Sequence, residues 1–275
     1  MLSIISNISS LDAQNNLTNT ENQLSSSLQK LSSGMRINTA MDDAAGLGIS
    51  VNLESDISSY SQASNNANDG ISVAQTAEGA LNQTSNIISR LRDLAMESAS
   101  DGISDTQRAY VQTEATQLTS EVDRIANDTT YNGTALLNSS SGTLNFQVGI
   151  GNSSVNDRIS VGTVNATAAT LLGSATLDFS TASGAVNALG VLSTALDTVS
   201  NDRSNLGAIG NRLSDAASTI STISQNLSAA DSRIRDVDVA AETSNMTRLQ
   251  VLAQAGVSVL AQANQTPQVA LKLLQ

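Results

Sequence analysis

Apolar residues recur every seven positions between Leu192 and Ile234, which is the most regular pattern in the chain. A second apolar row follows three residues later, and alternating steps of three and four are typical of a coiled-coil seam. The pattern predicts one long helix, about 65 Å over this stretch at 1.5 Å per residue. Another helix must cover the stripe, either from a second copy as a dimerisation zipper or by antiparallel packing inside the chain. The rows are Leu192, Val199, Leu206, Leu213, Ile220, Leu227 and Ile234, with Ile209, Ala216, Ile223 and Ala230.

Amphipathic stripes in the first half of the chain predict helices that could cover this seam. One stripe runs from Val111 to Ile125, and Ser104 with Gln107 has the sequence of a capping box that begins its helix. Another stripe runs from Ala77 to Leu94, and the polar residues 100–102 predict a turn between the two helices.

Glycine and asparagine mark the predicted helix ends. The stretch 131–134, Tyr-Asn-Gly-Thr, predicts the turn that ends the second of these helices. From the residues alone, Asp69 and Gly70 also predict a break in the chain before Ala77, because glycine is unfavourable inside a helix.

The pattern changes between residues 139 and 180. Apolar residues alternate with polar ones or glycine from Leu144 to Ile150, which predicts a strand, and Ile159 with Val161 predicts a second strand. Gly, Ser and Asn separate the two, as in a hairpin. The expected fold is therefore mainly α, a bundle of long coiled-coil helices with a small insert rich in β-hairpin.

Both ends of the chain are amphipathic, with one apolar and one polar face. Their narrow seams cannot be buried in a lone subunit, so we expect both ends to be largely disordered in the monomer and to order when neighbouring copies supply the missing face. Small residues in the C-terminal seam should permit close approach of helices. The seams comprise Leu17, Leu24, Leu28 and Leu31 at one end and Met246, Leu249, Ala253, Gly256, Leu260 and Ala263 at the other.

Composition removes most catalytic chemistry. The chain lacks His, Cys and Trp, so His-based acid–base catalysis, thiol chemistry, disulfides and zinc ligation by His or Cys are excluded. Small side chains dominate, and only five residues are aromatic. We expect no catalytic residue, no metal and no cofactor, and we expect that the chain is not an enzyme. An enzyme hidden in the β insert is a disfavoured alternative.

Charge and hydropathy limit the partners. The formal net charge is −12, and Lys30 and Lys272 are the only lysines, so nucleic acid is not an expected partner. No apolar run approaches the 18 residues of a membrane span. The first seven residues lack the basic and apolar regions of a conventional signal peptide, which is therefore not expected.

Two short motifs could suggest a chemical site but do not. Asp42 and Asp43 are adjacent, so on a helix their carboxylates would point to different faces. Residues 46–48, Gly-Leu-Gly, follow no predicted strand and precede no lysine in P-loop spacing, so they are no phosphate cradle.

Several motifs resemble those of bacterial flagellins. Residues 31–46 (LSSGMRINTAMDDAAG) are similar to the N-terminal signature of that family, and residues 261–268 (AQANQTPQ) with the ending 271–275 are similar to its C-terminal signature. Residues 146–149 (FQVG) and 232–238 (SRIRDVD) are also similar to flagellin segments. The motifs stand in the family's order across essentially the whole chain, which resembles a short flagellin without large outer domains.

This resemblance implies a structural subunit that self-assembles into the extracellular bacterial flagellar filament for motility. The inner coiled-coil domain would comprise residues 1–42 and 235–275, with an assembly seam formed by Leu17, Leu24, Leu28, Leu31, Leu249, Gly256, Leu260 and Ala263. The second domain would comprise the helices of 43–138, the β-rich insert of 139–180 and the long helix of 181–234, with a seam formed by Leu206, Leu213, Ile220, Leu227 and Ile234. The resemblance also implies a continuous helix through Asp69–Gly70, and a connector at Asp42–Asp43 with Arg36 as an ion-pair partner.

The implied partners are other copies in a helical homopolymer, the hook–filament junction and filament cap proteins, an export chaperone and the flagellar type III export apparatus. Arg90, Leu94 and Glu114 resemble a patch that an animal Toll-like receptor reads on many flagellins, although Ser89 stands where the family usually has glutamine. Otherwise Arg90 and Glu114 are ordinary surface or subunit-contact residues. Alternatives are a flagellin-like hook–filament junction protein and, from a different class, a chemoreceptor-like signalling coiled coil.

Overall fold

The computed structural model describes residues 7–138, 142–173 and 177–272. The predicted ends of the terminal segments, 1–6 and 273–275, lie outside the described residues. Contacts divide the chain into two compact units, Met1–Ile57 with Asn226–Gln275 and Ser58–Gln225. The domain boundaries expected at residues 42 and 235 stay a prediction, and each unit is described by itself.

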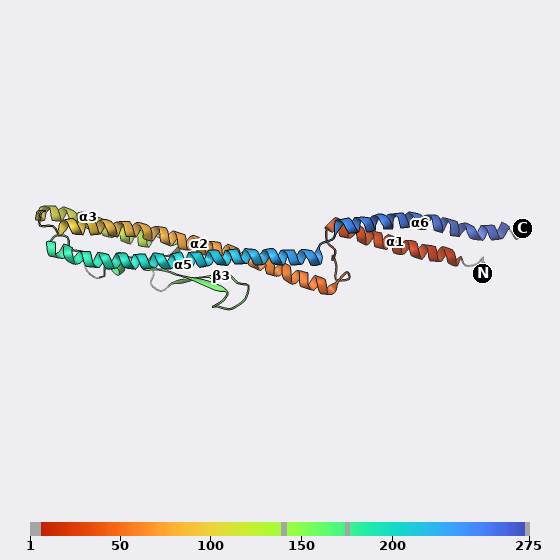
Figure 1. Ribbon diagram of the computed structural model, residues 1–275, viewed down its shortest axis with the longest axis horizontal. Helices are drawn as coiled ribbons and strands as arrows, with labels where there is room; N and C mark the ends of the chain where they lie inside the picture. Colours follow the sequence, from red (N-terminus) through yellow and green to blue (C-terminus); the bar gives the residue numbers. More distant parts are fainter. Residues whose placement is uncertain (1–6, 139–141, 174–176, 273–275) are drawn as a thin grey trace. The chain divides into compact units, whose positions relative to one another are not determined.

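In the first unit, α1 (Ile8–Ser33) and α6 (Val239–Lys272) lie side by side and antiparallel (Figure 1). The start of α1 is capped by Asn7, whose side chain accepts a hydrogen bond from the Ser10 N–H at 3.2 Å and donates to the Ala263 carbonyl at 2.8 Å. At the other end of the pair, the Ser27 hydroxyl donates to the Glu242 carboxylate. These bonds fix the register of the two helices.

Two longer helices, α2 (Ala44–Ser98) and α5 (Ala182–Arg235), take part in both units. Helix α2 continues without a break through Gly70, so the helix boundary predicted there from the residues alone is wrong and the continuity implied by the family resemblance is confirmed. Gly70 is tolerated because it is buried against neighbours: a Cβ there would lie 3.0 Å from both Leu213 Cδ1 and Phe146 Cγ.

The second unit contains the larger core. Helix α3 (Asp105–Asp128) begins at the predicted capping box, in which Gln107 N–H donates to Ser104 Oγ and Ser104 N–H donates to Gln107 Oε1. Helices α2 and α5 run antiparallel here, as shown by the bond from the Ser98 hydroxyl to the Phe179 carbonyl near one end and by the Gly70–Leu213 approach further along.

Two antiparallel strand pairs and a short helix follow α3. Strands β1 (Thr130–Tyr131) and β2 (Thr134–Ala135) form a tight hairpin, at the turn predicted after α3. Strands β3 (Thr143–Gln147) and β4 (Arg158–Gly162) pair with Asn145 opposite Ser160, which confirms the predicted hairpin. Helix α4 (Ala168–Leu171) follows.

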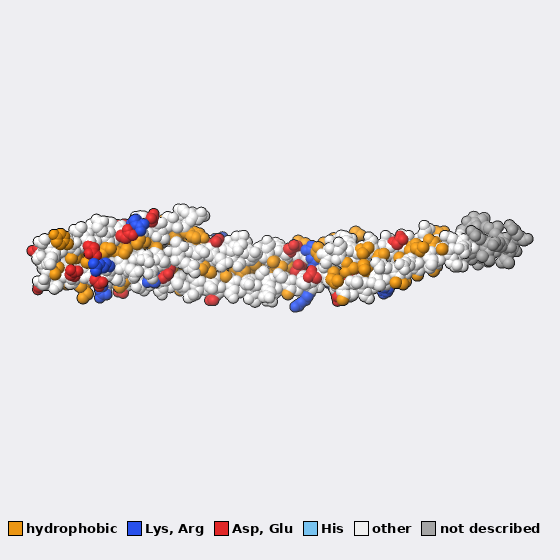
Figure 2. All heavy atoms as spheres, turned by 90° about the horizontal axis from the view of Figure 1, so that it is seen from above, with side chains coloured by type: hydrophobic (Ala, Val, Ile, Leu, Met, Phe, Trp, Pro, Cys, Tyr) orange, Lys and Arg blue, Asp and Glu red, His pale blue; other side chains and the backbone are white. Residues whose placement is uncertain are grey.

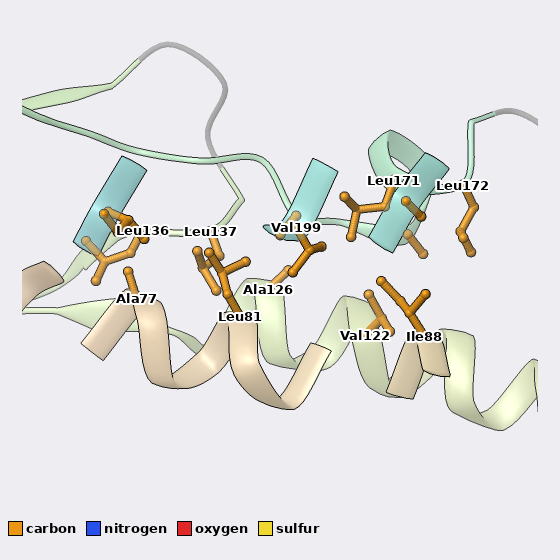
Figure 3. Packing of buried hydrophobic residues seen from close by; sticks show 14 of the residues in the cluster. Ala77, Leu81, Ile88, Val122, Ala126, Leu136, Leu137, Leu171, Leu172 and Val199 are labelled. Carbon is orange, nitrogen blue, oxygen red and sulfur yellow. The ribbon is translucent and has the colours of Figure 1, made fainter. Parts of the chain in front are cut away.

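The core of the second unit lies where α2, α3, α5 and the insert meet. In Figure 3, Leu81 and Ile88 of α2 lie among Val122 of α3, Val199 of α5 and Leu137, which follows β2. The mostly α fold with a small β-hairpin insert that the sequence predicts is therefore confirmed.

Candidate functional site

The terminal helix pair, formed by α1 and α6, covers the predicted apolar seam only in part. Leu249 and Ala263 of α6 are buried. Gly256 lies close to α1, since a Cβ there would be 3.2 Å from Leu17 Cδ1. Leu28 differs from the rest of the predicted seam, because 48% of its surface is exposed. The half-buried seam residues are Leu17, Leu24, Leu31, Gly256 and Leu260.

Further apolar side chains on the outside of the same pair have no covering element among the described residues. Figure 2 shows hydrophobic side chains gathered over this pair. Six apolar residues of α1 and α6, which we call the outer apolar set, are each at least half exposed. None of these side chains was predicted from the sequence, although the apolar residues at 251, 252, 257 and 259, which lie outside the seam, could have indicated them. The outer apolar set comprises Ile8, Leu11, Val251, Leu252, Val257 and Val259.

Part of the outer apolar set borders a shallow groove of about 260 Å³ between α1 and α6. Its walls are apolar at Leu17, Leu252 and Val259, and its remaining lining residues are small or uncharged: Ala13, Asn16, Thr20, Ala255 and Gly256. A groove of this size can accept one or two apolar side chains of another helix.

The connector between α1 and α2 is built from short-range hydrogen bonds. Gly34 has a φ of 72° and ends α1, and the chain then pairs with the end of α5 through the Arg36 N–H and the Arg235 carbonyl at 2.6 Å. Asp42 accepts hydrogen bonds from the backbone N–H and hydroxyl of Thr39 and from the Asn38 N–H. These bonds hold the pKa of Asp42 below its usual value.

The expected ion pair between Arg36 and the two aspartates is wrong. The Arg36 guanidinium instead donates to the carbonyl oxygens of Arg233 and Ile234, at 3.3 Å and 2.7 Å, where the C-terminal end of α5 leaves acceptors free. Asp43 accepts from the Gly46 N–H at 2.9 Å and so caps the start of α2.

Further ionic and polar bonds join the start of α2 to the end of α5 inside the first unit. The Ser50 hydroxyl donates to Asp231 at 2.6 Å, and Arg235 pairs with Glu54 at 3.1 Å.

In the terminal pair, hydrogen bonds from the Ser27 hydroxyl, and secondarily from Asn245, lower the pKa of Glu242. Together these bonds fix the geometry of the helix ends.

The predicted second seam belongs to α5. Leu206, Leu213 and Ile220 are buried, whereas Leu227 and Ile234 are half-buried. Of the two coverings that the heptads allowed, the structure shows antiparallel packing inside the chain, where the Arg203 guanidinium also pairs with Glu78 of α2 at 2.8 Å.

The third predicted set lies on α2 and α3. Arg90 and Glu114 are joined by an ion pair at 2.7 Å, and their side chains are 52% and 45% exposed. Leu94 is buried, with 1% of its surface exposed, so in this fold it supports the patch from beneath. Their role as receptor contacts stays a prediction.

Within the described ranges, no cluster of three or more His, Cys, Asp or Glu side chains could hold a metal ion. None of the helices, over the part of the chain that was searched, is long and apolar enough to cross a membrane. The grouping that stands out is therefore apolar, and it lies on the terminal helix pair.

Comparison with known sequences gives the family. Residues 4–142 match the model of the bacterial flagellin N-terminal helical region, and residues 189–274 match that of the C-terminal helical region. The chain is 40% identical to a flagellin of Xenorhabdus nematophila, with 100% of each chain covered. It is 38% identical to the flagellar filament 33 kDa core protein of Treponema phagedenis, with 98% of each covered.

Solved structures show the same fold. Bacillus cereus flagellin matches with a TM-score of 0.52 and 24% identity, over 61% of this chain and 94% of that one. A flagellar hook-associated protein of Vibrio parahaemolyticus matches with a TM-score of 0.59 and 15% identity, over 71% of this chain and 100% of that one. Since both terminal regions match flagellin and the relatives cover the full length, the junction-protein and chemoreceptor alternatives are not favoured. The chain belongs to the bacterial flagellin family.

Proposed function

We propose that the outer apolar set of the terminal pair is the surface through which this flagellin joins its copies in the flagellar filament. The observation that carries the proposal is exposure: Val251, Val257 and their neighbours lie open to water on a pair of helices too thin to bury them. Fully burying a valine or leucine side chain contributes about 1.5–3 kcal/mol, so covering several half-exposed ones supplies several kcal/mol per contact.

The groove beside Gly256 supports the same proposal. The groove can bind exposed apolar side chains of another copy, and the exposed apolar side chains of this chain can in turn enter the groove of a neighbouring copy. Val257 lies about 160° around α6 from Val259, which lines the groove, so Val257 and the groove face different directions. A surface and its complement on different faces of one subunit give a head-to-tail contact, and repeating that contact without closure produces a helical polymer. In the polymer, residues 1–42 and 235–275 form the inner coiled-coil domain, and 43–234 form the second.

Polymerisation of valine-to-threonine variants tests the assembly surface. The double change Val257→Thr and Val259→Thr keeps the side-chain shape but places hydroxyls in the contact. Burying a hydroxyl without a hydrogen-bond partner weakens the contact by about 1–3 kcal/mol. We expect the critical concentration for polymerisation to rise at least about tenfold. Val186→Thr is the matched control, because Val186 and Val257 are both 56% exposed while Val186 lies in the other unit. Equal critical concentrations for all three proteins would contradict the proposal.

The terminal pair also serves the remaining flagellar contacts in this proposal. Hook–filament junction and cap proteins would meet the same apolar surface at the two ends of the polymer, which the shared fold with a hook-associated protein supports. An export chaperone would cover the surface before secretion through the flagellar type III apparatus, and a chain without cysteine cannot crosslink on that route. The product is an extracellular structural protein and not an enzyme.

A second proposed interaction concerns an animal Toll-like receptor. The exposed Arg90–Glu114 pair supports it, because a fixed guanidinium beside a carboxylate offers a partner both donors and acceptors. A reporter-cell assay of soluble protein tests it, with Arg90→Ala as the variant and Arg124→Ala as the control, since Arg124 is a comparably exposed arginine of α3 paired to Glu121. Loss of signal in the first variant alone is expected, and equal signals would remove the receptor role.

A further inference from the structure

The β1–β2 hairpin carries the only Asn–Gly pair in the 275-residue sequence. Asn132 and Gly133 form its two-residue loop, with φ angles of 48° and 78°. Two successive left-handed residues are the pattern of a type I′ turn, for which Asn-Gly is the preferred sequence. Both residues are exposed to solvent.

No interaction within the described residues restrains the two groups that could react with each other. Neither the Asn132 carboxamide nor the Gly133 N–H takes part in a hydrogen bond there. Asn138, a few residues further on, provides a contrast, because its amide donates to the Asn127 side chain at 3.2 Å. Glycine also has no Cβ that would hinder its nitrogen from approaching the neighbouring side chain.

We propose that Asn132 is a site of spontaneous deamidation. The Gly133 backbone nitrogen forms a bond to Cγ of Asn132 and loses its proton, and the side-chain amide leaves as ammonia, which gives a cyclic succinimide. Water then opens the ring at either carbonyl, so the products are aspartate or isoaspartate. The balance is one water consumed and one ammonia released, with no oxidation or reduction.

Ring closure requires Asn132 to leave its left-handed conformation, and the local structure lets it do so cheaply. The hairpin has two pairs only, Thr130 with Ala135 and Tyr131 with Thr134, and so short a ladder is marginal by itself. Buried core residues lie on both sides of it, Ala126 before it and Leu136 and Leu137 after it, and Tyr131 of the hairpin packs against this core, whereas Asn132 and Gly133 are exposed. The loop can therefore open locally while the second unit stays folded.

The two products have different consequences. Aspartate at 132 suits a type I′ turn as asparagine does, but it adds a negative charge four residues after the exposed Asp128. Isoaspartate lengthens the backbone by one carbon, which no longer fits a two-residue loop. The hairpin then opens, and the bond from the Leu136 N–H to the Thr129 carbonyl, at 3.1 Å, is lost with it. The modified fraction rises with the age of each subunit.

Peptide mass mapping of the folded protein, incubated in mildly alkaline buffer, tests the proposal. We expect the mass change of amide loss at Asn132 to accumulate at least about tenfold faster than at Asn138 or Asn152, each of which precedes a serine. Asn132→Asp supplies the aspartate standard that separates the two products, and Asn132→Gln should abolish the modification because the five-membered ring cannot form.

Two results would overturn the proposal. One is loss of the Asn132 amide no faster than that of Asn138 and Asn152. The other is an intact Asn132 in the folded protein under conditions in which a free peptide of residues 128–137 deamidates, because the turn would then protect the site.

Discussion

Gly70 and Gly79 make a matched pair for measuring how closely the second unit is packed. Both lie inside α2, so replacing either by alanine should give the same gain in helix propensity, about 1 kcal/mol. Their surroundings differ. A Cβ at Gly79 would meet nothing within 4 Å, whereas a Cβ at Gly70 would lie 3.0 Å from Leu213 Cδ1 and 3.0 Å from Phe146 Cγ.

The expected cost at Gly70 comes from overpacking. Leu213 is fully buried on α5, and Phe146 lies in β3, where Asn66 of α2 donates to the next carbonyl, that of Gln147, at 2.9 Å. The new methyl group therefore has to displace a side chain or part of the β3–β4 hairpin, which typically costs about 1–3 kcal/mol. The gain in helix propensity is the same in both variants, so the difference between their free energies of unfolding equals the cost of overpacking.

Thermal unfolding of the monomeric chain, followed by circular dichroism, measures that difference. Gly79→Ala should raise the Tm of the second unit. The Tm of Gly70→Ala should be lower than that of Gly79→Ala by about 2–4 °C for each kcal/mol of overpacking. Adding Phe146→Leu to Gly70→Ala should recover part of the loss, because a smaller side chain then faces the new methyl group. If Gly70→Ala is as stabilising as Gly79→Ala, the close approach of α2, α5 and the hairpin is wrong.

Two further predictions concern buried and ionic contacts. Arg108→Leu removes charge-assisted bonds to the Ser98 and Ser100 carbonyls at 2.9 Å and 2.8 Å, so urea unfolding should show a loss of about 2–3 kcal/mol, and an unchanged midpoint would refute the role of this arginine. The Ser27 hydroxyl holds the pKa of Glu242 below its ordinary value, so this carboxylate stabilises the fold above the pKa of the unfolded chain and stops doing so as the pH falls through the lower folded value. Acid titration by circular dichroism should therefore show that the stability of Glu242→Gln depends less on pH than that of the unchanged protein. Identical titration curves for the two proteins would contradict a lowered pKa of Glu242.

The sequence predicts the helical part of the fold well because the pattern and the packing have the same period. The heptads of α5 place Leu206 and Leu213 in the core, and the capping box at Ser104 begins α3 where expected. Periodicity fails where a tertiary contact overrides local preference. Gly70 looks like a helix breaker, yet it stays helical because neighbouring side chains occupy the space beside it.

The candidate site was only half predictable. A seam pattern identifies the face that a helix turns toward its partner, and Leu249 and Ala263 of that face are buried. It does not reveal a second apolar surface beside the seam, so Val257 and its neighbours were missed. Arg36 was misassigned for a different reason: sequence shows charges, whereas the carbonyl acceptors at the end of α5 exist only once that helix has formed.

Thiol accessibility at position 257 tests the central claim most directly. The chain has no cysteine, so Val257→Cys introduces a single thiol on the outer face of α6, and Val186→Cys supplies an equally exposed control. The account predicts that a thiol reagent modifies both variants as monomers and that polymerisation protects position 257 by at least about tenfold more than position 186. Equal reactivity of position 257 in monomer and polymer would contradict assembly through the terminal helix pair.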